Sequence, residues 1–310
     1  MKNNLRLLTV ASCLLVCSLG YGDSASSAKP TLRVGTFNIR CISKSDKEDR
    51  AWNARKADVV ELIRKMKADV LGLQEVTPAQ MAYLKAALGE NYEIDGAFRN
   101  KDMKSGEAVP VCFLKSRFDL LQSGTFWLSA QPDSPGSKNW GAAFPRTCTW
   151  VVLKDRMTKK SFCFANTHPD HKSAEARLNG VKVIAARLAK ESGGVPVILV
   201  GDHNCADEEP PAVFLRSVYD DSIFICKTPP KGPWRTFSGW QKIAREVPAV
   251  EALRLRPGAR EQGRAHRIDY IYVSKKKVNV LEYATIGLTR KGADEYYSDH
   301  FPVMARVEIK

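Results

Sequence analysis

The sequence lacks several of the motifs that most often reveal what a protein does. No two of its eight cysteines have the Cys-x-x-Cys spacing, so neither a zinc ribbon nor a dithiol redox motif is indicated. No Gly-x-Ser-x-Gly motif is present, which argues against a serine hydrolase with a nucleophile elbow. The chain also has no internal repeat, no low-complexity linker and no regularly spaced basic and aromatic tract of the kind that lines a nucleic-acid groove. Its chemistry must therefore reside in dispersed polar residues.

The first 28 residues have the layout of a secretory signal peptide. Lys2 and Arg6 precede an apolar run over residues 7–19, and Ser26 and Ala28 occupy the −3 and −1 positions of a cleavage site. A lipoprotein anchor at Cys13 is disfavoured, because only about four apolar residues precede it where about 7–15 are expected. No later apolar run is long enough to span a membrane. We therefore expect residues 29–310 to be secreted or periplasmic, without a transmembrane segment.

The charge balance is strongly basic. Lysine and arginine number 48 against 34 aspartates and glutamates, which gives a formal net charge of +14. A basic surface suits phosphorylated or polyanionic partners, although lysines that only keep the surface soluble would give the same balance. Six cysteines follow the signal peptide, several of them within apolar runs. Exported proteins can form disulfides, and buried thiols can equally serve as small core residues, so pairing stays open.

Strand and helix patterns alternate along the rest of the chain. β-Branched and apolar runs predict strands, and stripes of apolar residues with capping signals predict helices. The predicted strands are 31–39, 68–76, 109–114, 120–128, 147–154, 161–167, 195–200, 267–273, 279–285 and 302–309, and the predicted helices are 52–67, 78–88 and 174–191. A long surface loop is expected over 129–145. Mixed strands in two groups predict a four-layer α/β sandwich, with two packed mixed β-sheets flanked by helices in one domain over 29–310.

Polar residues that can bind a metal or a phosphate recur where the predicted strands end. A charged group beside a buried strand costs several kcal/mol unless it is paired or bound to a metal. One such residue could simply cap a turn, but the ends of neighbouring strands come together in space. Carboxylates and amides suit Mg²⁺, Mn²⁺ or Ca²⁺ better than Zn²⁺. The residues are Asn38, Glu75, Asn166, His168, Asp202, Asn204, Asp269, Asp299 and His300.

In their order along the chain these segments resemble the motifs of the endonuclease/exonuclease/phosphatase superfamily, which has the deoxyribonuclease-I-like fold. The segments are Phe37-Asn38-Ile39, Leu73-Gln74-Glu75, Asn166-Thr167-His168, Gly201-Asp202-His203-Asn204, Arg267-Ile268-Asp269-Tyr270-Ile271 and Ser298-Asp299-His300. The resemblance extends over about residues 32–307. Trp127-Leu128-Ser129 and Pro145-Arg146 are similar to the secreted and nocturnin-like branch of that superfamily.

The resemblance implies a role for each residue. Glu75 and Asp299 would hold the catalytic cation, Mg²⁺ or Mn²⁺ with Ca²⁺ as an alternative, and Asn38 would touch the metal or the phosphate. Asp202 would orient or deprotonate the attacking water, and Asn204 would steady the water or the phosphate. His300, held by Asp269, would contact the phosphoryl oxygens or transfer a proton. His168 and Arg146 would bind the phosphate from other sides. An in-line hydrolysis needs these elements: an aligned water, neutralised equatorial oxygens and help for the departing oxygen.

Some positions depart from the superfamily pattern or stay ambiguous. His203 stands where an aromatic residue is usual, Pro169 where leucine is commoner, and Ser238 where histidine is frequent. His171 and His203 are either further phosphate contacts or structural residues. A cluster of arginines could form a basic rim that steers an anionic substrate, or could lie in a solvated loop. The cluster comprises Arg254, Arg256, Arg260, Arg264 and Arg267.

Together these features predict an exported, divalent-metal-dependent phosphoesterase that hydrolyses phosphate esters by in-line attack of an activated water. The substrate stays open among nucleic acid, a sugar or nucleotide phosphate and a lipid headgroup, and no protein partner is implied. The alternative is an exported binding module that keeps the fold without catalysis. Such a module would be expected to have lost part of the site, but Glu75, Asp202, Asp269, Asp299 and His300 are all present.

Overall fold

The structure is a computed structural model in which residues 30–242, 246–255, 266–290 and 295–310 are described. The expected signal peptide, residues 1–28, lies outside the described residues. Every predicted strand and helix is present, with ends that differ by a few residues from those expected. Of the helices in the described ranges, none combines the length and the apolarity that a membrane crossing requires. The cysteines from Cys41 to Cys226 all carry free thiols.

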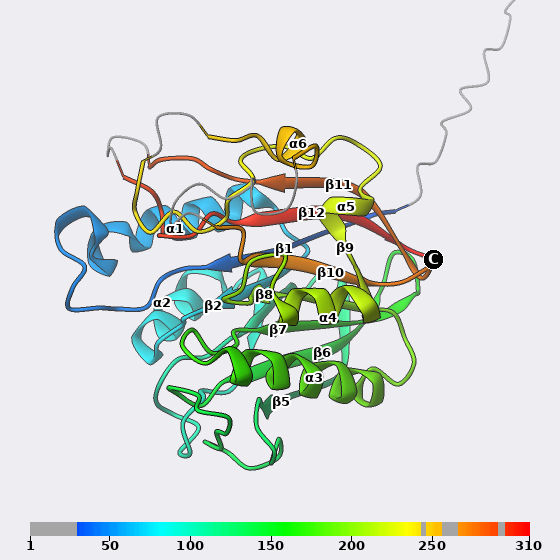
Figure 1. Cartoon of the computed structure of the whole chain (residues 1–310), viewed down its shortest axis with the longest axis horizontal. Helices are drawn as coiled ribbons and strands as arrows, with labels where there is room; N and C mark the ends of the chain where they lie inside the picture. The colour runs from blue at the N-terminus through cyan, green and yellow to red at the C-terminus, as the bar shows by residue number, and fades with distance from the viewer. Residues whose placement is uncertain (1–29, 243–245, 256–265, 291–294) are drawn as a thin grey trace, which may run out of the picture.

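Two six-stranded mixed sheets form the centre of the molecule (Figure 1). The first has the order β11-β12-β1-β2-β4-β3, with bounds Val278–Thr285, Val303–Ile309, Leu32–Asn38, Val70–Gln74, Val111–Leu114 and Tyr92–Asp95. The second has the order β5-β6-β7-β8-β10-β9, with bounds Phe118–Trp127, Thr147–Asp155, Ser161–Thr167, Val197–Asp202, Asp269–Ser274 and Tyr219–Asp221. Valine, isoleucine and phenylalanine side chains of both sheets pack between them, among them Val34, Val70, Val200 and Ile271. The sheets thus share one apolar interior.

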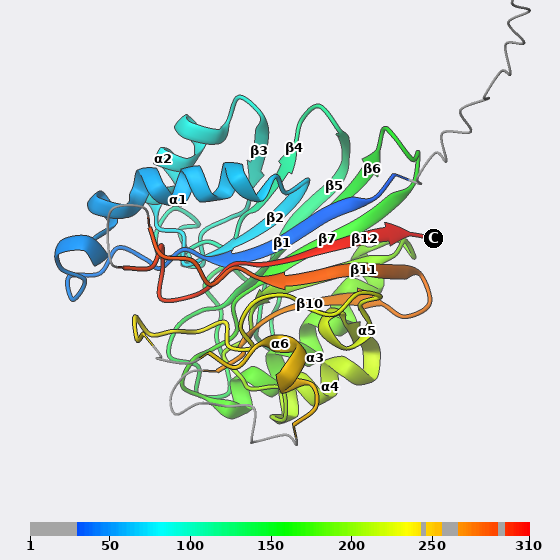
Figure 2. The same ribbon diagram turned by 90° about the horizontal axis from the view of Figure 1, so that it is seen from above.

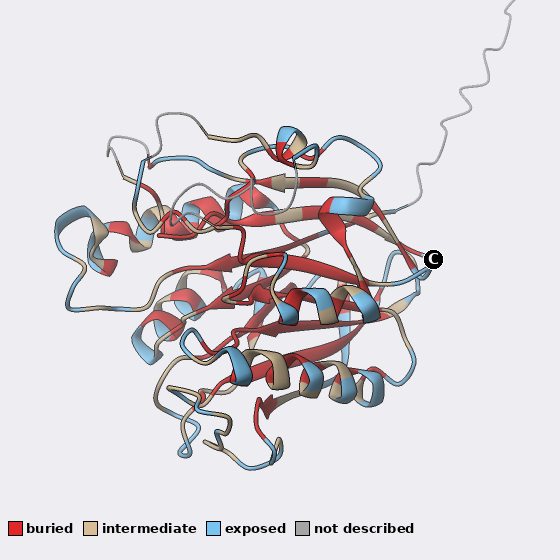
Figure 3. Cartoon of the chain, in the orientation of Figure 1, coloured by how far each residue is buried: buried red, intermediate tan, exposed pale blue. Residues whose placement is uncertain are grey.

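Helices cover the outer faces of both sheets. α1 (Trp52–Met66) and α2 (Pro78–Leu88) lie on the first sheet, and α3 (Ala174–Glu191) and α4 (Pro210–Val218) lie on the second (Figures 1 and 2). The faces that these helices turn to the sheets are buried and their outer faces are exposed (Figure 3). Shorter helices are η1 (Glu48–Arg50), α5 (Ser222–Ile225) and α6 (Ala249–Ala252). The predicted four-layer α/β sandwich is confirmed.

Each sheet contains one parallel pair of strands joined by a helix. β1 and β2 are parallel with Asn38 beside Gln74, and β7 and β8 are parallel with Thr167 beside Gly201. A parallel pair needs such a crossover, so α1 and α3 are required by the strand directions. The carboxyl ends of β1 and β2 in the first sheet and of β7 and β8 in the second therefore lie at the same end of the sandwich.

The predicted basic rim is wrong for Arg267. Its side chain is fully buried, its Nη2 lies 2.6 Å from Asp221 Oδ1, and its guanidinium lies 4.3 Å from the centre of the Tyr270 ring. Arg254 is exposed, whereas Arg256, Arg260 and Arg264 lie outside the described residues. Arg267 is thus an internal ion-pair partner that joins the start of β10 to β9, where Asp221 and the ring contacts compensate its charge.

His203 also belongs to the interior and makes no contact with a substrate site. It is fully buried, and its ring stands edge-on to Tyr270 and Tyr272, with centroids 5.4 and 5.5 Å apart. Burial, with a smaller contribution from Arg267, lowers the pKa of His203 to about 3. The imidazole therefore replaces an aromatic ring as a neutral core residue.

We expect the stability of the protein to depend on pH through His203. Its pKa is lower in the folded than in the unfolded state, so its contribution is fully present above about pH 6.5 and is lost as the pH falls toward 3. His203→Phe keeps the edge-on contacts and removes the titration. In urea unfolding with EDTA, the variant should gain about 1 kcal/mol over the wild type for each pH unit below 6.5. Parallel stability curves between pH 7.5 and 4 would contradict this assignment.

Candidate active site

The strand ends of the two sheets bring the predicted residues together. Asn38 ends β1, Glu75 follows β2, His168 follows β7 and Asp202 ends β8. Asp269 begins β10 directly beside Asp202 in the antiparallel register. Asp299 and His300 lie just before β12. Each residue lies at one end of a buried strand or next to it. The pairing register of the strands in both sheets therefore sets the positions of these side chains.

The side-chain amide of Asn38 lies at the centre of the cluster. The backbone N–H of Arg40 donates to Asn38 Oδ1 at 2.9 Å, which turns Nδ2 toward the carboxylates. Nδ2 lies 3.0 Å from both Glu75 Oε1 and Asp202 Oδ2. Since Asn38 is fully buried, one amide joins an acid of the first sheet to an acid of the second.

His300 and Asp269 form a buried pair. His300 Nδ1 lies 2.9 Å from Asp269 Oδ2, and Nε2 lies 3.6 Å from Asp202 Oδ2. Burial would lower the pKa of His300, but Asp269 and Asp202 outweigh it and raise the pKa to about 10. The ring is therefore protonated on both nitrogens near neutral pH, with Nδ1–H donating to Asp269. Nε2–H is then a donor on the side of the cluster.

Asp202 is the carboxylate with the strongest tendency to accept a proton. Burial raises the pKa of Asp202 to about 7, against the opposing effect of His300. Its Oδ1 accepts the backbone N–H of Asn204 at 2.9 Å, and its Oδ2 lies 3.3 Å from His168 Nε2. Burial, and then Arg146, lowers the pKa of His168 well below its usual value, so this ring stays neutral.

Glu75 and Asp299 provide the remaining carboxylate oxygens. Glu75 has a left-handed backbone, with φ of 62°, and its Oε2 accepts the N–H of Cys41 at 2.8 Å. Burial opposes its ionisation, but this N–H, the Asn38 amide and the positive charge of His300 hold the pKa of Glu75 well below its usual range. Asp299 Oδ2 lies 3.6 Å from Arg40 Nη1. Burial raises the pKa of Asp299.

These oxygens are suited to a divalent cation. Glu75, Asp202 and His300 offer ligand atoms that all lie within 4.8 Å of one another. The doubly protonated His300 has no lone pair to give, so carboxylate oxygens are the available donors. Buried carboxylates this close together repel one another unless a cation or a proton compensates them. An all-oxygen donor set fits Mg²⁺, Mn²⁺ or Ca²⁺.

The cluster lines a cavity of about 400 Å³. Of the predicted residues, Asn38, Asn166 and Asp269 are fully buried and do not line it, and the others do. Asn204 donates through Nδ2 to Pro169 O at 3.1 Å, and Ser238 Oγ donates to Asp299 O at 2.8 Å. The departures at Pro169 and Ser238 thus support the backbone of the site. Lining residues that were not predicted are Arg40, Cys41, Glu107, Phe144, Phe237 and Ile268.

The unpredicted lining residues differ in whether the sequence offers a signal that could have identified them. Arg40 follows the first strand motif and Phe144 precedes Pro145-Arg146, so both adjoin segments that the sequence singles out. Glu107 lies in the connection between β3 and β4, where no pattern distinguishes it from other surface acids. Its position comes from Arg99, whose Nη1 lies 2.6 Å from Glu107 Oε2.

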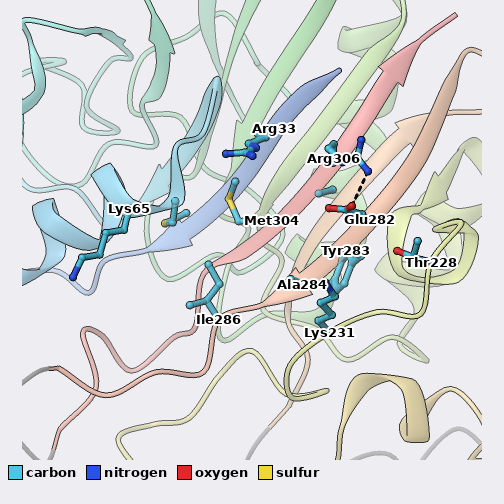
Figure 4. Close-up of a pocket in the computed structure, with 12 residues that line it drawn as sticks. Arg33, Lys65, Thr228, Lys231, Glu282, Tyr283, Ala284, Ile286, Met304 and Arg306 are labelled. Atoms are coloured by element: carbon cyan, nitrogen blue, oxygen red, sulfur yellow. Dashed lines mark hydrogen bonds and ion pairs between the residues drawn. The ribbon is translucent and has the colours of Figure 1, made fainter. Parts of the chain in front are cut away.

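A second hollow, of about 280 Å³, lies on the outer face of β1, β11 and β12 (Figure 4). Among the described residues that line it, Glu282 is the one carboxylate, and it pairs with Arg306 at 2.6 Å. The other charged side chains there are Arg33, Lys65 and Lys231. The larger cavity gathers more carboxylates than this hollow does, so it is the candidate active site.

Comparisons with known proteins agree with this geometry. The model of the Endonuclease/Exonuclease/phosphatase family matches residues 35–300. An endonuclease/exonuclease/phosphatase structure from Bacteroides vulgatus is 29% identical with a TM-score of 0.78, and covers 91% of this chain and 100% of that one. A mannosyl-6-phosphatase structure from Bacteroides thetaiotaomicron is 27% identical with a TM-score of 0.77, and covers 90% and 100%.

Among curated proteins, nocturnin of Drosophila melanogaster is 25% identical over 342 residues, which cover 99% of this chain and 50% of nocturnin. The chain spans between a third and a half of the length of the curated relatives it matches. The resemblance inferred from the ordered motifs is confirmed, because the family match extends from the first strand to His300. The chain belongs to the Endonuclease/Exonuclease/phosphatase family.

Proposed function

We propose that this protein is a divalent-metal-dependent phosphatase that releases inorganic phosphate from a small phosphate monoester. The observation that carries the proposal is the convergence of Glu75, Asp202, Asp299 and His300 on one cavity of about 400 Å³. A cavity of this size suits a small molecule. The likeness to a mannosyl-6-phosphatase over the full length of that chain also favours a phosphorylated sugar over a polymer.

Glu75 and Asp299 would hold the cation, with Asn38 beside them. When bound, such an ion neutralises charge on the phosphoryl oxygens and assists the departing oxygen. The assignment is supported by the repulsion between Glu75 and Asp299, which raises the pKa of Asp299 after the larger effect of burial, and by Arg40, which lies 3.6 Å from Asp299 and compensates this charge only in part. Oxygen ligands of this kind leave the choice between Mg²⁺ and Mn²⁺ to cation size and availability.

The residues of the chain divide the remaining work. Asp202 accepts a proton from the water that attacks phosphorus, and the N–H of Asn204 fixes its other oxygen. His300, oriented by Asp269, donates Nε2–H to a phosphoryl oxygen. His168 and Arg146 bind further phosphoryl oxygens from the cavity wall.

The reaction consumes one water for each ester. The water oxygen forms a bond to phosphorus on the face opposite the departing alcohol, and the bond from phosphorus to the ester oxygen breaks. The proton taken by Asp202 leaves with the products, which are an alcohol and inorganic phosphate. No redox partner or second substrate is required.

Binding of the cation is testable without turnover. Mg²⁺ or Mn²⁺ at about 100 times its dissociation constant should stabilise the wild type by about 2.7 kcal/mol relative to EDTA. Glu75→Gln should lose most of this effect because it removes a charged ligand. Glu93→Gln, at an exposed site outside the cavity, is the control and should keep it. Thermal unfolding with and without cation measures the difference, and equal stabilisation of Glu75→Gln would refute the metal assignment.

The catalytic assignment predicts a loss of rate without a loss of fold. Asp202→Asn and His300→Ala should each lower kcat by about 10²–10⁴-fold, since each removes a proton-transfer or charge-stabilising group. Asp133→Asn, whose side chain is 81% exposed, should retain activity. Phosphate release is measured from mannose 6-phosphate and p-nitrophenyl phosphate, beside bis-p-nitrophenyl phosphate, DNA, RNA and sphingomyelin. Turnover confined to diesters would overturn the monoester proposal, and near-normal rates in both variants would overturn the site.

We also propose that the protein is exported. The basic start at Lys2 and Arg6, the apolar run and the small residues up to Ala28 support cleavage near residue 28. Expression of the full chain with its native start in a bacterial host should yield a periplasmic or extracellular product whose amino terminus is at about Lys29. Amino-terminal sequencing measures this. An uncleaved product retained in the cytoplasm would contradict the proposal.

A further inference from the structure

One wall of the cavity has no part in the roles assigned above. It consists of Phe144 and His171, whose rings are inclined by only 14° with centroids 6.1 Å apart. Phe144 is 47% exposed, although it sits in a polar loop. Phe144 lines the cavity as well, so its exposed ring can pack against a ligand that enters there.

The wall is held rigidly by a buried carboxylate. Asp170 is 2% exposed, and it accepts the backbone N–H groups of Ala143, Lys172 and Ser173 at 2.9–3.0 Å. Ser173 Oγ also donates to Trp140 O at 2.6 Å. These bonds join the loop before Phe144 to the loop that carries His171. Because the two rings are fixed before any ligand arrives, little conformational entropy would be lost on binding.

The contact with Arg146 determines which ring nitrogen of His171 carries the proton. Arg146, which is 6% exposed, places Nη2 2.8 Å from His171 Nδ1. Arginine can only donate, so Nδ1 is the acceptor and the proton of the neutral ring is on Nε2. Burial, and then Arg146, lowers the pKa of His171 and favours this neutral form. Arg146, which would bind the phosphate, thus also fixes the tautomer of His171.

An acceptor adjoins the same wall. The Arg99 guanidinium lies 4.6 Å from the centre of the Phe144 ring and pairs with the carboxylate of Glu107. Glu107 lines the cavity, with Oε2 4.0 Å from Arg146 Nη1. The wall therefore combines an aromatic face, an N–H donor and a carboxylate acceptor beside the phosphate position. A pyranose ring matches all three, since its C–H face packs on aromatic rings and its hydroxyls both donate and accept hydrogen bonds.

We propose that Phe144 and His171 form the subsite for the leaving group, and that this group is a monosaccharide ring. The inference rests on the proposed phosphatase function and adds the part of the substrate that the catalytic residues do not contact. A lipid headgroup fits less well, because a single exposed phenylalanine offers no continuous apolar surface for acyl chains. A nucleobase would also stack on these rings, so the choice of a sugar over a nucleotide rests on the likeness to a mannosyl-6-phosphatase.

The test compares mannose 6-phosphate with mannitol 1-phosphate, which share the six-carbon chain and the phosphate and differ in the ring. The wild type should favour mannose 6-phosphate in kcat/KM. Phe144→Ala should lower kcat/KM for mannose 6-phosphate by about tenfold, the usual effect of losing an aromatic contact. It should change the value for mannitol 1-phosphate by less than about threefold. His171→Ala should also reduce the ring preference, and Phe144→Tyr should restore it.

Leu121→Ala is the matched control, because Leu121 is 50% exposed and lies on β5 away from the cavity lining. This variant should behave as the wild type with both substrates. An equal effect of Phe144→Ala on the two substrates, or no effect on either, would overturn the subsite while leaving the phosphatase proposal intact.

A calorimetric measurement separates failure of the subsite from failure of the proposed reaction. Both compounds are titrated into Asp202→Asn and into Asp202→Asn with Phe144→Ala, in the presence of Mg²⁺. The subsite is supported if the double variant binds mannose 6-phosphate more weakly than Asp202→Asn does and binds mannitol 1-phosphate equally well. This outcome supports it even if the wild type hydrolyses neither compound. Equal affinities in the two proteins, or no binding of mannose 6-phosphate, would overturn it.

Discussion

Hydrogen bonds donated by two side-chain amides join the two sheets at the end where the cavity lies, and the site depends on them. Gln74 Nε2 donates to Asn166 Oδ1 at 2.6 Å, and Nδ2 of Asn38, which lies beside Gln74 in the parallel register, donates to Asp202 Oδ2 at 3.0 Å. The approach needs a glycine, since a Cβ at Gly72 would lie 2.6 Å from Asn166. Buried amides must be satisfied, so a shifted register in either sheet would lose these bonds. The strand register that positions the acids of the cavity is thus the same register that allows these bonds to hold the two sheets together.

Most of the fold could be predicted because its main elements carry strong local signals. Residues 195–200 are nearly all apolar, as expected of a strand buried on both faces, and Thr77 with Pro78 marks a helix start that a capping box with Gln80 completes. The missed strands lack such signals. β3 has four residues and β9 has three, and strands this short form only because a longer neighbour offers its free edge. Their existence is a tertiary property.

The candidate site was predictable where it depends on strand ends and unpredictable where it depends on loops. Asn38, Glu75 and Asp202 follow apolar runs, and the order of the motifs identifies them. Phe144 and Glu107 reach the cavity through the path of their loops, which Asp170 and Arg99 fix from distant positions. Arg267 and His203 show the opposite case, because each has the chemistry of a site residue and the sequence left its role open, but both are buried in the core. Their partners, Asp221 and the tyrosines of β10, cannot be deduced from local sequence.

The charge distribution of the site connects the fold with the proposed function. Four carboxylates, those of buried Asp202, Asp269 and Asp299 and of half-buried Glu75, are answered within the fold by protonated His300 and by Arg40. A fold that accepts this excess of negative charge gives up stability there, as functional sites commonly do. The excess favours a divalent cation, and in the proposed function the cation together with Arg146 would turn an acidic pocket into one that attracts a phosphate group. The net charge of the chain, +14, would add to that attraction. The acids that cost the fold stability would then be the reason that an anionic substrate binds in the cavity.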